Sequence, residues 1–494
     1  MIDYLLPFKT ANFTSNFLLL KRFPKFDVYI WIQGPQNHQT IKTNTMKIRF
    51  SRLSLPKILL SLSLLLILTL SKAQDKSALN ANWPEWRGKY NTGAVTAGNT
   101  PIEFSETKNV KWKIEIPGKG HATPIIWGNQ IIIQTAVASD KKVEKPDAAG
   151  KPASPMAPNQ TDFVHQFKVI SVDKASGKIN WQTVVKEVQP TERTHELGSW
   201  ASNSALTDGQ NIFSHFGSRG LYCLDMKGKV LWERNFGQMD IVASFGEGST
   251  PAMYKDKIFV PWDHQGKSFL YAIDKKTGKD IWTAERDEIT SWATPLIVEV
   301  NGKAQIITSA TNKVRSYDAE TGQVVWECTG MTKNVIPSPT YCDGILFLLS
   351  GFRGNAVKAI DLAKAKGDIT GTPAILWEYN QDASYTPSPL LMDGKLYFLK
   401  ANNGIMTCLN AKDGKVIYSN QKLDGINNIY SSPTGNNDKI YIAAAGVVDV
   451  VKAGGDFALL SKNTLDDTFE ASPVIVGNDL FLRGYKYLYC ISEK

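Results

Sequence analysis

Short apolar runs separated by polar turns recur along most of the chain. Each copy begins with Ser or Thr, continues through an apolar run and a polar turn, and ends in a second β-rich run, as in TPIIWGNQIIIQT from Thr123 and TPAMYKDKIFVPW from Thr250. This alternation with turn residues predicts a β-hairpin in every copy. The second position is Pro in every copy but one, at Pro124, Ala205, Pro251, Pro295, Pro339, Pro389, Pro433 and Pro473.

A second pattern closes most units, as in SVDKASGKINW (171–181) and AIDKKTGKDIW (272–282). An Asp opens a tight turn, a Gly takes the positive φ, and the next strand delivers a large aromatic residue. We therefore interpret Asp173, Asp225, Asp274 and Asp318 as turn formers rather than catalytic acids. The aromatic residues expected to pack between neighbouring sheets are Trp112, Trp181, Trp232, Trp282, Trp326, Trp377 and Tyr418.

Hairpin and turn together give four strands per unit, in eight units with no helical stretch between them. This predicts an all-β fold, an eight-bladed β-propeller of four-stranded antiparallel blades, over residues 75–494. The final unit ends at LYCISEK without an aromatic outer strand, and KNVKWKIEI (108–116) supplies one early in the chain. We expect the ring to close by pairing of these N-terminal and C-terminal strands. A loop insert rich in Pro, Ala, Lys and Asp is expected near 138–162.

The charge of the 494-residue chain is concentrated at its start. The formal net charge is +9, but residues 1–73 hold ten Lys or Arg and two Asp or Glu, leaving 46 basic against 45 acidic residues. A near-neutral body disfavours nucleic-acid binding. Residues 46–73 have the cationic, apolar and small-residue layout of a signal peptide. We expect residues 1–45 to be either a start assigned too far upstream or a disordered segment. The competing interpretation of residues 46–73 is a membrane anchor that is not cleaved.

The sequence offers few candidates for disulfides, metal sites or catalytic groups. The five cysteines (Cys223, Cys328, Cys342, Cys408 and Cys490) are not clustered, and those in LYCLD, MTCLN and LYCIS are expected to be small buried apolar residues. The six histidines lack metal-ligand spacing, so no metal site is predicted. We assign no catalytic residues from the sequence.

One face of the ring remains a candidate site. The segments leading into the first strands surround the channel of a propeller, and loops there are free to carry function. The candidate ligand-binding residues at this mouth are His121, His195, Trp200, Glu247, Asp263, His264, Arg286, Trp292, Arg353 and Tyr385. The competing interpretation is structural: Trp200 and Trp292 fill the channel, and the charges are solvated at its rim.

The repeated turn-and-Trp signature resembles that of the PQQ-like β-propeller repeat family. NWPEWRG (82–88), PGKGHATP (117–124) and DKKTGKDIW (274–282) are most similar to exported bacterial members of that family. The family includes quinoprotein dehydrogenases and the propeller lipoprotein of the outer-membrane assembly machinery. The quinone PQQ is therefore implied by resemblance alone, and we expect that no cofactor is required.

These observations favour an exported, non-catalytic propeller, periplasmic or secreted, that binds an envelope protein or small ligand. After signal cleavage we expect a monomer with no membrane span. The first alternative is a quinone-dependent oxidoreductase acting on an alcohol or sugar. A carbohydrate-processing enzyme using Glu247, Asp263 or Glu470 is a further alternative.

We expect the exported chain to begin near Gln74, because small residues at Ser71 and Ala73 end the apolar segment. Amino-terminal sequencing of the protein from the cell envelope checks this. Met1 at the start of exported protein would contradict it.

Overall fold

The computed structural model describes residues 82–143, 155–190 and 192–493. The expected start 1–45 and signal peptide 46–73 lie outside this part of the chain. Within it, the regular elements are strands and two short 3-10 helices, η1 (Gly217–Arg219) and η2 (Val242–Ser244). No helix among the described residues is long and apolar enough to span a membrane.

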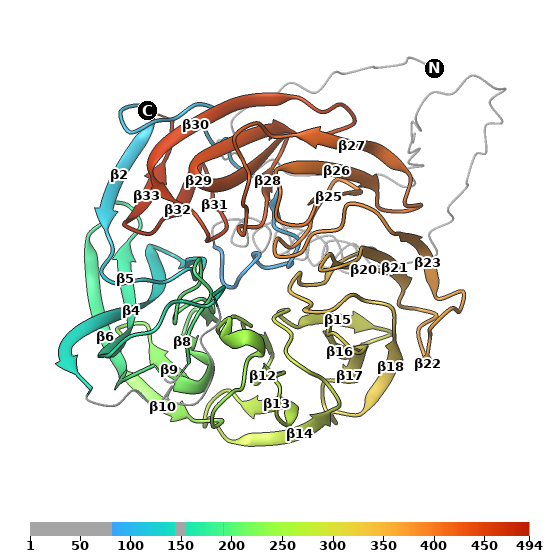
Figure 1. Ribbon diagram of the computed structural model, residues 1–494, viewed down its shortest axis with the longest axis horizontal. Helices are drawn as coiled ribbons and strands as arrows, with labels where there is room; N and C mark the ends of the chain where they lie inside the picture. Colours follow the sequence, from blue (N-terminus) through green and yellow to red (C-terminus); the bar gives the residue numbers. More distant parts are fainter. Residues whose placement is uncertain (1–81, 144–154, 191, 494) are drawn as a thin grey trace, which may run out of the picture. The chain divides into compact units, whose positions relative to one another are not determined.

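Eight sheets are arranged radially around a common centre, with the last strand of each at the outer rim (Figure 1). This confirms the all-β eight-bladed β-propeller. Blade 1 consists of β3 (Ile125–Trp127), β4 (Gln130–Lys142), β5 (Phe163–Asp173) and β6 (Ile179–Val188), and blade 2 of β7 (Leu206–Thr207), β8 (Asn211–His215), β9 (Leu221–Asp225) and β10 (Val230–Arg234). Blade 3 consists of β11 (Ala252–Tyr254), β12 (Lys257–Trp262), β13 (Ser268–Asp274) and β14 (Asp280–Arg286), and blade 4 of β15 (Leu296–Val300), β16 (Lys303–Thr308), β17 (Val314–Asp318) and β18 (Val324–Cys328). Blade 5 consists of β19 (Thr340–Cys342), β20 (Ile345–Ser350), β21 (Ala356–Asp361) and β23 (Ile375–Tyr379), and blade 6 of β24 (Leu390–Met392), β25 (Lys395–Leu399), β26 (Ile405–Asn410) and β27 (Val416–Lys422). Blade 7 consists of β28 (Thr434–Asn436), β29 (Lys439–Lys452) and β30 (Leu459–Thr468), and blade 8 of β31 (Val474–Val476), β32 (Asp479–Arg483), β33 (Tyr487–Ile491) and β2 (Val110–Glu115).

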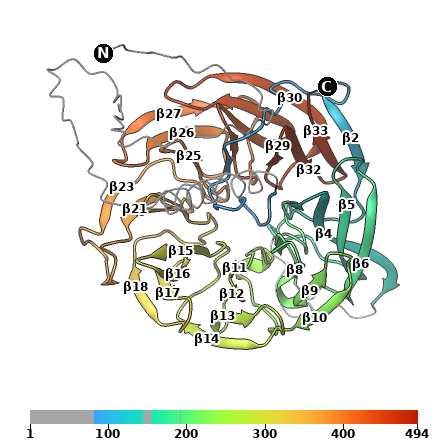
Figure 2. The same cartoon turned by 180° about the vertical axis from the view of Figure 1, so that it is seen from behind.

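Strands from the two ends of the ring close it in blade 8. Strand β2 pairs antiparallel with β33, placing Trp112 opposite Cys490 and Ile114 opposite Leu488. Figure 2 shows these two strands side by side from the opposite face. Pairing removes two sheet edges that would otherwise be open to aggregation. The predicted closure is confirmed.

Two short strands pair in parallel and extend the antiparallel pattern. β1 (Ala94–Val95) lies beside β28, and β22 (Gly367–Asp368) lies beside the rim strand β18. In blade 7, β29 pairs with β28 through residues 439–441 and with β30 through residues 445–451.

Hydroxyl side chains link the first strands of neighbouring blades around the hub. The backbone N–H of Ser204 donates to Thr250 Oγ1 at 3.0 Å, and that of Thr250 donates to Thr294 Oγ1 at 3.3 Å. Bonds of 2.8–3.0 Å continue this chain in order through Thr294, Ser338, Ser388, Ser432, Ser472 and Thr123. The backbone N–H of Ser204 keeps its bond to Thr250 although Ala205 replaces the usual Pro, so this bond does not depend on the proline.

The repeated Trp and Gly form one contact at the rim. Trp282 Nε1–H donates to Ala319 O at 3.2 Å, and the indole lies over Gly322 of the next blade, where a Cβ would approach within 2.7 Å. The glycine is thus required both by its positive φ and by the close indole. The same contact joins Trp112 to Gly177, Trp181 to Gly228, Trp232 to Gly278, and Trp377 to Gly414.

The expected turn formers act as predicted. Asp274 Oδ1 accepts the Thr277 N–H at 2.8 Å, which fixes the turn before the rim strand. Equivalent bonds are made by Asp173, Asp225 and Asp318.

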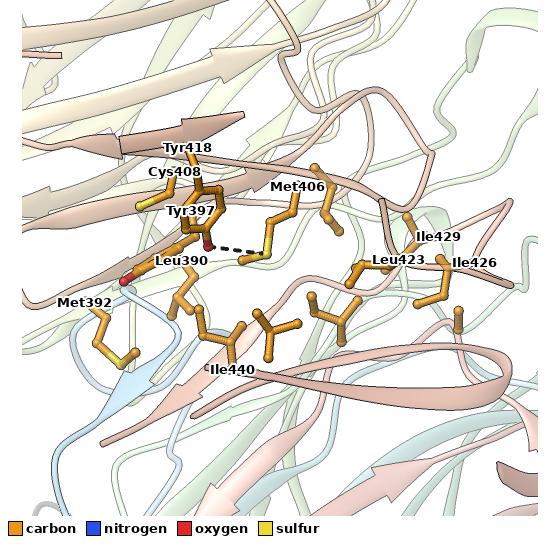
Figure 3. Packing of buried hydrophobic residues seen from close by; sticks show 14 residues of the cluster. Leu390, Met392, Tyr397, Met406, Cys408, Tyr418, Leu423, Ile426, Ile429 and Ile440 are labelled. Carbon is orange, nitrogen blue, oxygen red and sulfur yellow. Dashed lines mark hydrogen bonds between the residues drawn. The ribbon is translucent and has the colours of Figure 1, made fainter. Parts of the chain in front are cut away.

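Two aromatic residues pack between blades in a different way. Trp326 is fully buried and donates to Gln305 Oε1 of its own blade at 3.2 Å, because β22 covers it from outside. Tyr418 lies within an apolar cluster between blades 6 and 7, with its hydroxyl 3.7 Å from Met406 Sδ (Figure 3). Cys408 belongs to this cluster and, like Cys223 and Cys490, is buried as expected.

The segment expected as a loop insert is partly strand. β4 continues through Lys142 and β5 begins at Phe163, and these two residues pair. The returning arm packs on the chain before blade 2, where Asn159 Nδ2 donates to Thr194 Oγ1 at 3.1 Å and to His195 O at 2.7 Å. Residues 144–154 lie outside the description.

We expect Gly278→Ala to destabilise the propeller more than Gly394→Ala. Both glycines have φ of +69°, but a Cβ at 278 would lie 2.6 Å from Trp232, whereas nothing lies within 4 Å of one at 394. The backbone cost of about 1–2 kcal/mol is common to both, and overpacking adds about 1–3 kcal/mol at 278. Unfolding midpoints in urea measure the difference. Equal midpoints would show that the indole contact contributes nothing.

We expect Asp449→Asn to stabilise the propeller increasingly as pH rises from 4 to 7. Asp449 is fully buried, neither carboxyl oxygen has a hydrogen-bond partner within the described part of the chain, and burial together with Asp424 raises its pKa to about 6 against the opposing charge of Lys462. A raised carboxyl pKa favours the folded state at low pH, and that contribution is lost as pH passes about 6. The gain should approach about 3 kcal/mol by pH 7, because the pKa lies about two pH units above its ordinary value of 3.8 and each unit corresponds to about 1.4 kcal/mol.

Thermal midpoints of the two proteins across this pH range provide the measurement. Asp456→Asn, at an exposed position in the loop between β29 and β30, is the control. A difference that does not change with pH would rule out an ionised, unpaired Asp449.

Candidate functional site

A cavity of about 660 Å³ opens at the face of the ring where the segments leading into the first strands meet. Its size falls within the range of small-ligand pockets. The hub hydroxyl residues contribute to its lining because they head the first strands. Those that line it are Thr123, Ser204, Thr250, Ser432 and Ser472.

The N-terminal segment crosses the centre of the ring (Figure 1). Trp83 exchanges backbone hydrogen bonds of 2.8 Å with Ile126 of blade 1, and Thr92 O accepts from Leu391 N of blade 6 at 3.1 Å. Trp86, between these anchors, lines the cavity. The segment therefore bridges inner strands across the hub and supplies part of the cavity wall.

A buried arginine fixes this segment. The Arg87 guanidinium donates to Pro433 O and Pro389 O, both at 2.9 Å, and burial lowers its pKa to about 9. A Cβ on Gly93 would lie 1.9 Å from Arg87 Nη2, so this position requires glycine. The arginine of the NWPEWRG motif therefore positions the segment.

Aromatic rings form much of the remaining wall. Phe352 and Tyr385 stack with centroids 4.8 Å apart, and His195 lies 5.5 Å from Phe245 and 6.0 Å from Tyr430. All five line the cavity. Such rings present flat apolar surface with polar edges.

Two expected residues, Trp292 and Arg353, complete the lining together with Met156, which was not expected. Trp292 Nε1–H donates to Gly246 O at 2.8 Å, which fixes the indole in the wall. The Arg353 guanidinium lies 5.2 Å from the Phe352 ring centre and is exposed. Met156 comes from the returning arm of the insert, so that arm contributes directly to the cavity.

His121 and Glu470 line the cavity where blade 8 meets blade 1. The His121 ring stacks on Tyr485 at 4.9 Å, and burial, with Lys119 and Arg483 nearby, lowers its pKa to about 3. His121 is therefore neutral near pH 7. Burial raises the pKa of Glu470 to about 8, although Lys119 opposes this shift.

Glu247 reaches the cavity but its carboxylate is already engaged. Its Oε2 accepts from Ser218 N at 2.6 Å and from Arg219 Nη1 at 3.1 Å, and both charged side chains are almost fully buried. The carboxylate thereby holds η1 against the hub. Such a paired group contributes to local structure rather than to acid–base chemistry.

Four expected site residues are absent from the cavity lining: Trp200, Asp263, His264 and Arg286. Asp263 and Arg286 form a buried bidentate ion pair of 2.7 and 2.9 Å, and Arg286 also donates to Tyr317 Oη at 2.7 Å. His264 Nδ1 accepts the N–H groups of Asp240 and Gly266 at 3.0 and 3.1 Å. Hydrogen bonds within the propeller, including those from Arg286 to blade 4, therefore account for these three polar side chains.

Trp200 also packs away from the cavity. Its Nε1–H donates to Glu192 O at 2.8 Å, and its ring meets His165 edge-on at 4.9 Å. Trp200 therefore neither lines nor fills the cavity, whereas Trp292 forms part of its wall.

The sequence-based set omitted several lining residues. Trp86 stood in a motif noticed for its family resemblance, and Phe352 adjoins the predicted Arg353. Glu470 was considered only as an acid of a carbohydrate-processing enzyme. It and Tyr430 precede the first strands of blades 8 and 7, as Trp292 precedes that of blade 4. Phe245 and Met156 had no sequence signal, because loop folding brings them to the cavity.

The lining does not fit a tricarboxylate quinone such as PQQ. It carries two carboxylates, Glu247 and Glu470, against one guanidinium, Arg353, whose exposed side chain lies over Phe352. Three ligand carboxylates would find one guanidinium in the lining to pair with. No cluster of three or more His, Cys, Asp or Glu suited to a metal ion occurs within the described ranges.

Comparison with known proteins identifies relatives with a role in the outer membrane. The outer membrane protein assembly factor BamB of Yersinia pestis is 21% identical over 336 residues, 64% of this chain and 77% of that protein. BamB of Francisella salina is 24% identical over 156 residues, 31% of this chain and only 27% of that protein. A solved europium-containing methanol dehydrogenase has a TM-score of 0.58 at 10% identity, covering 85% of this chain and all of that one, which shows a shared fold.

The family match agrees with the repeat pattern. The sequence model described as outer membrane protein assembly factor BamB matches residues 165–420, the region of blades 1 to 6. Because this match spans half of the 494 residues, the chain belongs to that family of PQQ-like propellers.

Proposed function

We propose that this protein is an exported, non-catalytic propeller that binds an extended segment of another envelope protein at its cavity. The observation that carries the proposal is the aromatic wall. Trp292, Phe352, Tyr385 and Tyr430 present ring surface to a cavity of about 660 Å³. Large rings at the centre of a concave site provide most of the binding energy in many protein interfaces.

The polar groups around the cavity favour a binding role. Glu247 is held by Arg219, and Asp263, outside the lining, is held by Arg286, so these acids stabilise the propeller itself. His121 is neutral near pH 7 and stacked on Tyr485. A peptide segment could place apolar side chains against the rings and bond its backbone to the half-buried polar edges.

The relatives indicate where such binding would take place. The proteins from Yersinia pestis and Francisella salina are named as outer membrane protein assembly factors. We extend this setting to the present chain: it would act in the cell envelope as an interaction scaffold during outer-membrane protein assembly. The signal-like segment 46–73 agrees with export.

We expect the double substitution Phe352→Ala with Tyr385→Ala to reduce retention of envelope proteins on the immobilised propeller at least tenfold. The stacked pair at 4.8 Å supplies one side of the aromatic wall, and its loss removes both contact area and shape. Quantitative mass spectrometry of proteins retained from a solubilised envelope fraction provides the measurement.

Leu231→Ala is the matched control, since Leu231 is 50% exposed on rim strand β10, away from the cavity. Unfolding midpoints establish that all variants fold. Equal retention by the double variant and the parent protein would overturn the proposed function.

A further inference from the structure

Glu470 differs from the other acids near the hub. It precedes β31, lines the cavity, and has the Tyr485 hydroxyl 3.4 Å from its Oε1. The Lys119 ammonium lies 5.4 Å from the centre of the Tyr485 ring. Within the described part of the chain, no basic group forms a direct ion pair with Glu470. Glu247, by contrast, has a direct partner in Arg219.

The surroundings of Glu470 leave its charge poorly compensated. The titratable groups facing it are the phenols of Tyr485 and Tyr430 and the ammonium of Lys119. Behind them, His121 is neutral near pH 7, while Arg483 donates to backbone carbonyls. Burial outweighs the opposing Lys119 charge, and the pKa of Glu470 rises to about 8. A carboxyl in this state gains most from a cation that enters with its ligand.

The rings of the same cavity suit a planar cation. Tyr385, Tyr430, Phe352 and Trp292 all line it, and aromatic faces attract guanidinium and ammonium groups. Arg353 shows this contact within the protein, since its guanidinium lies 5.2 Å from the Phe352 ring. Arg353 belongs to the β20–β21 loop of blade 5, whereas Glu470 precedes blade 8, so the two charges belong to separate parts of the wall.

We propose that the cavity receives an arginine side chain from the bound partner segment, with its guanidinium paired to Glu470 among the aromatic rings. This inference rests on the proposed function and specifies the chemistry of the partner. Arginine suits the site better than lysine, because its planar group pairs with a carboxylate through two hydrogen bonds and stacks on rings.

The test compares two pentapeptides that differ in one charge. Acetyl-Gly-Phe-Arg-Phe-Gly-amide and its citrulline counterpart have nearly the same shape, and calorimetry at pH 7.5 measures their affinities for the complete exported protein. We expect the arginine peptide to bind at least tenfold more tightly. Glu470→Gln should reduce that ratio to about one without altering the unfolding midpoint, because the amide resembles the protonated carboxyl.

A second measurement detects the proton that Glu470 releases when the arginine peptide binds. Pairing with arginine ionises Glu470, so binding at pH 7.5 should release about 0.8 proton, given a pKa of about 8. Calorimetry in buffers of different ionisation enthalpy measures this release, which should vanish in Glu470→Gln. Glu285→Gln, at an exposed position on rim strand β14, is the control and should behave as the parent protein.

The outcomes separate this inference from the proposed function. Equal binding of the two peptides, or a preference for arginine that survives Glu470→Gln, would overturn the arginine site. Absence of binding by either peptide would overturn it as well. In each case, retention of envelope proteins that depends on Phe352 and Tyr385 would still support the scaffold.

Discussion

The chain of hydrogen bonds from backbone N–H to hydroxyl around the hub is the constraint on which the rest of the structure depends. Each first strand begins inside the ring, where a backbone N–H has no access to water and must find an acceptor. The neighbouring blade supplies it through one Ser or Thr, so each blade positions the next. A bond of this kind contributes about 0.5–1.5 kcal/mol. The larger effect is geometric, because the bonds fix eight sheets at one radius.

The hub departs from this pattern between blades 1 and 2. The connection there contributes several residues to the cavity lining. The N–H groups of His121 and Ala122 both donate to Ala201 O, at 3.1 and 3.2 Å, in place of the hydroxyl bond. This junction interrupts the repeat with the insert and the segment carrying His195. A regular hub needs only short connections, whereas a longer connection can fold inward. The irregular junction therefore supplies residues to the cavity that the repeat does not specify.

The fold was predictable because its determinants are local and repeated. The turn Asp, the Gly and the following Trp lie within one short segment, and the indole contact recurs at a fixed place in successive blades. Even the closing strand carried the same aromatic residue, Trp112. The structure adds the reason for the glycine, since positive φ alone would also admit Asn at some cost. The lack of space beneath the indole excludes any side chain.

The site was predictable only in position. Loops before the first strands were expected to surround the channel, and His121, His195 and Trp292 do line the cavity. The pairing of Asp263 with Arg286 could not be inferred, because sequence shows both charges but not the distance between them. Trp200 likewise packs against His165, a contact that depends on how the insert folds back. Whether a polar side chain is free or paired is decided by three-dimensional neighbours that the repeat pattern does not encode.

The N-terminal segment gives the two faces of the ring different roles. By bridging inner strands across the hub, it places Trp86 in the cavity wall and fills space that water would occupy in an open channel. Reduced access of water raises the cost of an ionised carboxylate, which is the condition observed at Glu470. Arg87, which anchors that segment to blades 6 and 7, donates only to backbone carbonyls in the described contacts and brings no counter-ion to Glu470. The segment and Glu470 thus line one cavity, in which a bound cation would compensate the buried carboxyl group.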